Sequence, residues 1–265
     1  MMKMPVLFIG HGSPMNIISD NYFTRSLVKL GKDLPKPAAI LVVSAHWLTE
    51  GTFVTCEGKP KTIHDFGGFP EELYRINYPS PGSPADARLI TETVKNPAVK
   101  CSMDWGLDHA SWMILQHIYP KADIPVIEMS LDYSPYNDWN RKTLRYYYDL
   151  AKQLYFLREK NIMIIGSGNI VHNLRLADFE NTDAEPYEWA VEFDEKTKRA
   201  LLDRNHNELL DCQNLNRAAA LSVPTLDHYL PMIFAIALQG KDDALSFTHE
   251  GFQNASVSMR CFKIG

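Results

Sequence analysis

The chain has 265 residues, of which 45% are hydrophobic, and a formal net charge of −5 at pH 7. This length and apolar content predict one large domain with an extended core. The charge leaves no basic stripe for phosphates, which argues against nucleic acid as a partner, and no apolar stretch approaches the ~18 residues of a membrane span. Because the N-terminus enters a predicted strand directly and shows no signal peptide, we expect a cytoplasmic protein that does not associate with membranes.

The cysteines indicate which metal ligands to expect. Cys56, Cys101, Cys212 and Cys261 lie far apart and form no C-x-x-C pair. Their spacing predicts neither a zinc knuckle nor a disulfide framework. Any metal is therefore expected to be held by histidines and carboxylates.

The first half of the chain alternates short apolar runs with amphipathic segments. We expect helices over residues 20–33 and from Ser83, as N-cap, to about Val94. Strands are expected at residues 5–9, 38–45, 52–56 and 98–103. The paired glycines and the proline within residues 62–70 predict an ordered loop that is able to cover a site.

The second half contains most of the predicted helix. Strands are expected near residues 124–131 and 162–167, and helices over residues 137–160, 186–221 and 232–238. The inward face of the first of these helices carries Leu144, Tyr147, Leu150, Ala151, Leu154 and Leu157. Because proline is tolerated only in a first helical turn, Pro231 places His228 at or very near the start of a helix.

The C-terminal residues complete the predicted sheet. Residues 244–249 and 255–262 predict an antiparallel hairpin joined through Gly251 and Asn254. Strands that alternate with helices are typical of a sheet covered by helices. We therefore expect an α/β fold, in which a mixed, mainly parallel sheet is flanked by helices and ends in the antiparallel hairpin.

Three apolar runs end in a histidine that stands among small residues, and these histidines are His11, His46 and His172. Short runs rich in Ile and Val are typical of strands buried on both faces, and ligands of open α/β sheets collect at the carboxyl ends of such strands. If the three imidazoles converge, they form a site for a divalent metal ion. The structural alternative for His172 is a helix-capping turn with a hydrogen-bonded histidine.

The remaining histidines need a separate interpretation. His206 lies in a polar stretch and is expected to be solvated, while His117 and His249 have no small neighbours and are assigned to structure. His109 stands between Trp105 and Trp112, which indicates either core packing or a cleft with aromatic walls.

The loop with the paired glycines contributes two weaker candidates. His64 and Asp65 precede the glycines, and we interpret them as residues of a rim that faces substrate.

Six motifs together resemble the DOPA 4,5-extradiol dioxygenases, which are class III (LigB-like) ring-cleaving dioxygenases. The motifs are Gly-His-Gly-Ser-Pro at 10–14, Ser-Ala-His-Trp at 44–47, His-Asp-Phe-Gly-Gly-Phe-Pro at 64–70, Asp-His-Ala-Ser-Trp at 108–112, Gly-Asn-Ile-Val-His-Asn at 168–173 and His-Tyr-Leu-Pro at 228–231. They follow the order of the family and run through almost the whole chain. Ala110 departs from the family, where glycine follows the Asp-His pair.

The resemblance implies a single LigB-like domain over residues 1–265 and a metal-dependent enzyme that opens a catechol, such as DOPA, with molecular oxygen to give a semialdehyde. It implies that His11, His46 and His228 bind one divalent ion, Zn or Fe(II), because a histidine replaces the carboxylate ligand of the protocatechuate branch. His172 is then the general base and acid, or a fourth ligand. His109 is expected to donate a hydrogen bond to oxygen or substrate.

Two other functions remain open at this stage. The same histidines suit a zinc-dependent hydrolase of small molecules, although the chain has no H-E-x-x-H helix and no G-x-S-x-G elbow. A metal-binding scaffold without oxygenase activity is the other alternative.

Overall fold

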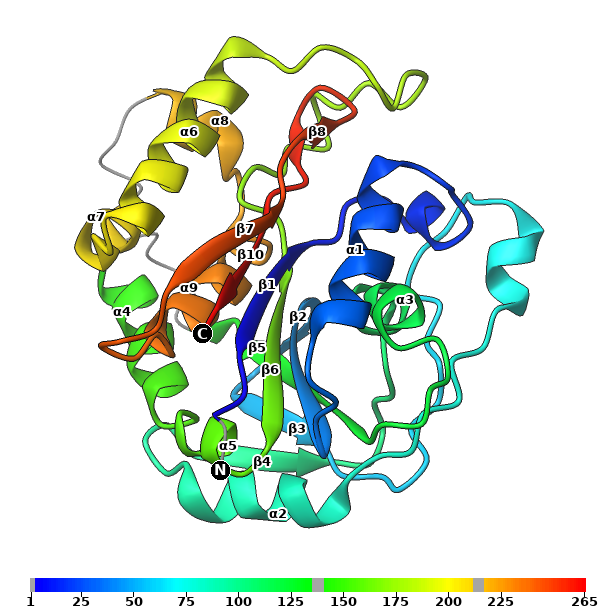
Figure 1. Ribbon diagram of the computed structural model, residues 1–265, viewed down its shortest axis with the longest axis vertical. Helices are drawn as coiled ribbons and strands as arrows, with labels where there is room; N and C mark the ends of the chain where they lie inside the picture. Colours follow the sequence, from blue (N-terminus) through cyan, green and yellow to red (C-terminus); the bar gives the residue numbers. More distant parts are fainter. Residues whose placement is uncertain (1–2, 135–140, 212–216) are drawn as a thin grey trace.

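The computed structural model describes residues 3–134, 141–211 and 217–265, and it shows a sheet between two layers of helices (Figure 1). Eight strands form the sheet in the order β4-β3-β5-β2-β6-β1-β10-β7. The strands are β1 Val6–Gly10, β2 Ala39–Thr49, β3 Thr52–Thr55, β4 Val99–Ser102, β5 Val126–Asp132, β6 Ile162–Gly168, β7 Leu245–His249 and β10 Cys261–Ile264. Two short strands, β8 Phe252–Gln253 and β9 Val257–Ser258, form a separate antiparallel hairpin.

The four central strands, β5, β2, β6 and β1, run parallel, whereas β10 pairs antiparallel with β1 and with β7. All residues of β1, β5 and β6 are buried. This burial explains why β1 and β6 are mainly apolar runs without alternation, as is usual for strands covered on both faces. The carboxyl ends of the parallel strands therefore share one edge of the sheet.

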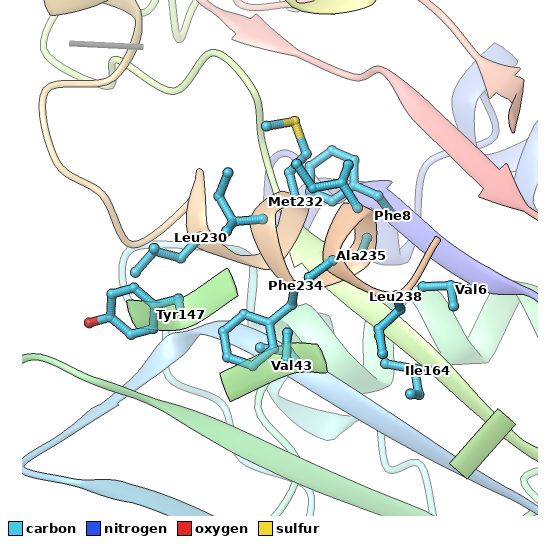
Figure 2. Close-up of a cluster of buried hydrophobic side chains, with 14 of the residues drawn as sticks. Val6, Phe8, Val43, Tyr147, Ile164, Leu230, Met232, Phe234, Ala235 and Leu238 are labelled. Atoms are coloured by element: carbon cyan, nitrogen blue, oxygen red, sulfur yellow. The ribbon is translucent and has the colours of Figure 1, made fainter. Parts of the chain in front are cut away.

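Helices cover both faces of this sheet. The helices are α1 Tyr22–Asp33, α2 Pro84–Thr93, α3 His109–Ile118, α4 Arg141–Lys152, α5 Phe156–Glu159, α6 Glu188–Leu202, α7 His206–Leu210, α8 Arg217–Ser222 and α9 Leu230–Ala237, with 3-10 turns at Pro14–Ile17 and Glu71–Arg75. α1 and α3 pack together on one side, and α9 and α4 pack on the other (Figure 1). Figure 2 shows α9 on the sheet, with Phe234 and Leu238 among side chains from β1, β2 and β6.

The expected α/β architecture is confirmed, with differences at the ends of elements. The helix predicted over residues 137–160 is divided, because α4 ends at Lys152 and α5 begins at Phe156; residues 137–140 lie outside the described part of the chain. Residues 212–216 of the helical segment predicted over 186–221 lie outside it as well. The last predicted strand is also divided, since β9 pairs with β8 and only β10 joins the main sheet.

Strand β2 is longer than predicted and irregular near its end. It continues to Thr49, and its pairing with β5 shifts register between Val43 and Leu48. Irregularities of this kind re-aim side chains and are common next to functional sites. His46 lies inside this irregular stretch.

The cysteines differ from the expectation. Cys56 and Cys101 form a disulfide, with their Cα atoms 5.7 Å apart. Parallel pairing of β3 with β4 brings together residues that are 45 positions apart, which spacing alone did not reveal. Cys261 is free and buried, and Cys212 lies outside the described residues. Stable disulfides are typical of oxidising compartments and rare in the cytosol, so the bridge argues against the cytoplasmic location expected from the sequence. That location stays a prediction.

None of the helices in the described part of the chain combines the length and the apolar character needed to cross a membrane.

Candidate metal centre

Three imidazoles from distant parts of the chain meet at the carboxyl edge of the sheet. His11 directly follows β1, His46 lies near the end of β2, and His228 precedes α9. The ring centroid of His11 lies 5.2 Å from that of His46 and 5.2 Å from that of His228, and the His46 and His228 centroids are 5.0 Å apart. The three rings thus form a nearly equilateral triangle.

Close contact between α9 and β6 brings His228 to this edge. A Cβ atom on Gly168 would lie 2.2 Å from the backbone oxygen of His228, and one on Gly166 would lie 2.2 Å from that of Pro231. The backbone N–H of Asn169 donates to the same His228 oxygen at 2.8 Å. The glycines at the end of β6 therefore allow the start of α9 to approach the strand.

Each of the three imidazoles has its Nδ1 atom beside an oxygen. Nδ1 of His11 lies 3.1 Å from Oγ of Ser167, and that hydroxyl donates to the carbonyl of Ala110, so it accepts from His11. Nδ1 of His46 lies 3.2 Å from Asp65, and Nδ1 of His228 contacts Asp227. The Nδ1 atoms therefore carry the protons, and the Nε2 lone pairs are free to bind a cation.

The spacing of these nitrogens fits a shared metal ion. Nε2 of His11 and Nε2 of His46 are 3.3 Å apart, and Nε2 of His228 is buried without a hydrogen-bond partner among the described residues. Two nitrogens at about 2.0–2.1 Å from one tetrahedral ion lie about 3.3 Å apart, and the corresponding ring centroids lie about 5.2 Å apart. A cation at the centre also removes the repulsion between lone pairs that face each other.

Two further imidazoles stand next to this triangle. The His172 ring stacks on the His228 ring, with centroids 3.5 Å apart and planes inclined by 10°. The His109 ring lies 4.1 Å from that of His46 and 5.7 Å from that of His11. Two groups of described residues have possible ligand atoms that all lie within 4.8 Å of one another. One group is His11, His46 and His109, and the other is His172, Asp227 and His228.

Burial and hydrogen bonding fix the charge state of several of these groups. Burial lowers the pKa of His11 well below its ordinary value, and the neighbouring imidazoles lower it further. Burial would raise the pKa of Asp65, but hydrogen bonds from His109 and His46 outweigh that effect, so the pKa lies far below its usual range. A neutral imidazole and an ionised carboxylate are the forms suited to a metal centre.

The rings open into a cavity of about 250 Å³. His11, His46, His109, His172 and His228 all line it, together with Asp65. His64 does not line it, because its Nε2 donates to the carbonyl of Ile76 at 3.0 Å and its ring packs against Trp112, Phe66 and Tyr74.

This geometry can be compared with known proteins. A family model described as the catalytic LigB subunit of aromatic ring-opening dioxygenase matches residues 6–260. The chain belongs to the LigB family. As a LigB-family member, it is an oxidoreductase of the ring-opening dioxygenase class.

Relatives of this LigB-family chain cover nearly all of its length. It is 42% identical to the 4,5-DOPA dioxygenase extradiol of Escherichia coli (strain K12), over 99% of this chain and 95% of that protein. It is 31% identical to the 4,5-DOPA dioxygenase extradiol of Mirabilis jalapa, over 92% of this chain and 90% of that protein. A solved structure of an uncharacterized protein from Escherichia coli K12 matches with a TM-score of 0.84 and 37% identity, and the match covers 99% of this chain and 100% of that one.

Asp65, which the sequence predicts to face substrate, lines the cavity and is held there by two imidazoles. One oxygen of Asp65 lies 2.9 Å from Nδ1 of His109, and the other accepts the backbone N–H of His109 at 2.9 Å. The first oxygen is also the one beside Nδ1 of His46. Asp65 thus ties its loop to the LigB-family centre and holds two imidazoles at once.

Several supporting residues of the centre were missed. Ser167 and Asp227 hold His11 and His228, and Asp227 could have been noticed as the neighbour of a candidate ligand. Asp108 caps α3 and accepts from Ser44, while Glu128 accepts from Trp105 and from the backbone of Asp108. Burial, followed by the negative charge of Asp108, raises the pKa of Glu128 well above its ordinary value. The sequence signal that could have indicated Glu128 is a single glutamate within an apolar strand.

The histidines outside the cavity have structural contacts. Nε2 of His117 lies 2.8 Å from the carbonyl of Asn16, and the ring of His249 packs against Phe23. The expectation for His206 was wrong. Its ring is half-buried between the Tyr148 hydroxyl, at 2.9 Å, and the Gln239 side-chain oxygen, at 3.0 Å, because α7 packs against its neighbours.

Proposed function

We propose that this enzyme opens the ring of a catechol next to its two hydroxyls, with both atoms of molecular oxygen entering the product. The observation that carries the proposal is the triangle of His11, His46 and His228, whose ring centroids lie 5.0–5.2 Å apart and which all line one cavity. These three residues would hold one divalent ion. When bound there, the ion supplies a Lewis acid that lowers the pKa of a catechol hydroxyl and, as iron, a redox centre for activating oxygen.

The ligand set bears on the choice of metal. Three neutral imidazoles leave the charge of a divalent cation unbalanced in the immediate site, unlike the 2-His-1-carboxylate set of many Fe(II) oxygenases. The carboxylates of Asp65 and Asp227 contact the Nδ1 atoms of His46 and His228 and so supply negative charge next to the proposed ligands. We propose Fe(II) as the active ion, with zinc as a competing occupant.

His172 is proposed as the general base and acid. Its ring lines the cavity and is stacked nearly parallel on His228. Because the lone pair of an imidazole nitrogen lies in the ring plane, two rings stacked nearly parallel direct their nitrogens along parallel lines and not at one point. This arrangement supports proton transfer with substrate over a role as a fourth ligand.

His109 is proposed to orient the substrate. Its Nδ1–H is directed at Asp65, so the neutral ring offers a lone pair on Nε2 to the cavity. Burial, followed by the charge of His46, lowers the pKa of His109. These contacts support an acceptor for a catechol hydroxyl, whereas the donor role expected from the sequence requires the protonated ring. Asp65 is proposed to position His46 and His109, and His64 to support the loop behind them.

Anaerobic reconstitution tests the proposal directly. Protein stripped of metal is loaded with Fe(II) under nitrogen and mixed with catechol, after which oxygen is admitted. The proposal predicts stoichiometric oxygen uptake and a yellow ring-cleavage product, and none with zinc. Zinc-loaded protein that hydrolyses esters or amides, without oxygen uptake by the iron form, would instead support the hydrolase alternative.

A further inference from the structure

Two polar side chains in the cavity wall carry hydrogen-bonding groups that the described part of the protein does not use. They are Ser13 and Asn254, which line the same cavity as the imidazoles. Apart from the histidines, Asp65 is the other polar side chain among the described lining residues, and its oxygens are taken by His46 and His109. Ser13 and Asn254 are therefore available to the polar part of a ring substituent.

The side-chain amide of Asn254 offers an acceptor. Its Nδ2 donates to the backbone carbonyl of Asp178 at 2.8 Å, and because a carbonyl can only accept, this contact fixes which arm of the amide carries the nitrogen. Oδ1, on the other arm, accepts no hydrogen bond from the residues that the structure describes, although Asn254 is only 8% exposed. A carbonyl oxygen in such a place gains when a bound molecule donates to it.

The hydroxyl of Ser13 offers a donor. Its Oγ accepts the backbone N–H of Met15 at 3.2 Å, and within the described chain its proton is donated to no other residue. A serine hydroxyl has one proton and two lone pairs, so that proton is available to an acceptor in the cavity.

A reciprocal pair of buried side-chain amides ties these two groups together. Nδ2 of Asn16 donates to Oε1 of Gln253 at 2.9 Å, and Nε2 of Gln253 donates back to Oδ1 of Asn16 at 3.1 Å. Asn16 belongs to the turn that Ser13 begins, and Gln253 directly precedes Asn254. Because Nδ2 of Asn16 also donates to the carbonyl of His11, at 3.3 Å, the pair is joined to the metal centre as well.

The charge of the wall decides which substituent these groups suit. None of the described residues that line the cavity is a lysine or an arginine. A substituent with an ammonium and a carboxylate on one carbon is neutral overall, so it enters such a wall without a counter-ion from the protein. It needs an acceptor for the ammonium and a donor for the carboxylate, which Asn254 and Ser13 supply.

We propose that Asn254 and Ser13 determine specificity for the side chain of the catechol. Oδ1 of Asn254 accepts from an α-ammonium group, and Oγ of Ser13 donates to the carboxylate on the same carbon. The inference rests on the proposed ring-opening function and assigns residues to the end of the substrate that lies away from the metal. Each contact is a hydrogen bond to a charged group, which is stronger than one between neutral groups.

The test compares DOPA with two analogues that each lack one charge. Dopamine lacks the carboxylate, 3-(3,4-dihydroxyphenyl)propionate lacks the ammonium, and unsubstituted catechol is the reference. Calorimetry on Fe(II)-loaded protein under nitrogen gives dissociation constants without ring opening, and oxygen uptake gives kcat/KM. We expect DOPA to bind about tenfold tighter than either analogue. If dopamine binds as tightly as DOPA, the role of Ser13 is wrong, and if the propionate does, the role of Asn254 is wrong.

Variants locate each contact. Asn254→Gly removes the acceptor and suits the φ of 54° at this position, and it should weaken DOPA and dopamine about tenfold while the propionate and catechol change less than about twofold. Ser13→Ala should weaken DOPA and the propionate about threefold to tenfold and spare dopamine and catechol. The control Asn181→Gly makes the same replacement at an exposed residue that does not line the cavity, and all four affinities should stay unchanged.

A merely structural role gives a different pattern. An equal loss of affinity for all four catechols, in either variant, would overturn the assignment of that residue. Oxygen uptake from every catechol without any preference among them would overturn the inference and leave the ring-opening function standing. Binding in the predicted order without oxygen uptake would refute that function and support the two side-chain contacts.

Discussion

Replacement of Gly168 by alanine tests whether close packing of α9 on β6 builds the metal centre. The new Cβ would lie 2.2 Å from the backbone oxygen of His228, whereas ordinary contacts begin at 3.4 Å. The start of α9 must therefore move by about 1 Å, which is several times the tolerance of about 0.2 Å on a metal–nitrogen distance. The substitution alters no side chain that binds metal.

We expect Gly168→Ala to weaken zinc binding about tenfold to a hundredfold, the range found when groups that support metal ligands are removed. This corresponds to about 1.4–2.7 kcal/mol of binding free energy. Competition with a chromophoric zinc chelator at pH 7 measures the affinity, and circular dichroism melting shows whether the variant is folded.

Gly58→Ala is the matched control, because its added Cβ would meet nothing closer than Pro84, at 3.9 Å. It changes the entropy of the unfolded chain by the same substitution and should bind zinc as the parent protein does. If Gly168→Ala binds zinc within twofold of Gly58→Ala and melts at the same temperature, the packing argument is wrong.

Three other predictions concern single side chains. His172→Ala should lower turnover by roughly 10²–10⁴ while the metal content measured by elemental analysis stays near that of the parent; unchanged turnover excludes proton transfer, and lost metal indicates a ligand. Asp227→Asn should weaken zinc binding by about 10–100-fold in the chelator assay, and the exposed-site control Asp20→Asn should not. Burial lowers the pKa of His249 to about 4. Between pH 6.5 and 4, His249 is therefore protonated in the unfolded chain but stays neutral in the folded chain. The free energy of unfolding that this group contributes is fully present above pH 6.5 and decreases as the pH is lowered, by about 1–2 kcal/mol at pH 5. Urea titrations of His249→Phe should lack that part of the pH dependence.

The parts of the centre that lie on buried parallel strands could be predicted from the sequence. The apolar runs before His11 and His172 identify β1 and β6, and strands of this kind place their carboxyl ends at one edge. Pro231 marked the start of α9 because proline is restricted to a first turn. The prediction that His228 meets the other two histidines followed only from the family resemblance, since no feature of the local sequence indicates where α9 packs.

Features that depend on contacts between distant segments could not be predicted. The loop with Asp65 is positioned by pairing with residues some forty positions later, including the hydrogen bond from Ile63 to the carbonyl of Leu107, so the bond between Asp65 and His109 has no local signature. The Cys56–Cys101 bridge depends on the pairing of β3 with β4. The register shift in β2, which turns His46 toward its partners, likewise arises from the pairing with β5.

The central claim is that His11, His46 and His228 hold one ion and that His109 does not. Its most direct test is the zinc affinity of the four single alanine variants at these positions. Substitution of each of the three proposed ligands should weaken binding by about a hundredfold or more, and His109→Ala should change it less than about tenfold. A variant at 109 that loses zinc while the variant at 228 retains it would contradict the account and assign the ion to His11, His46 and His109.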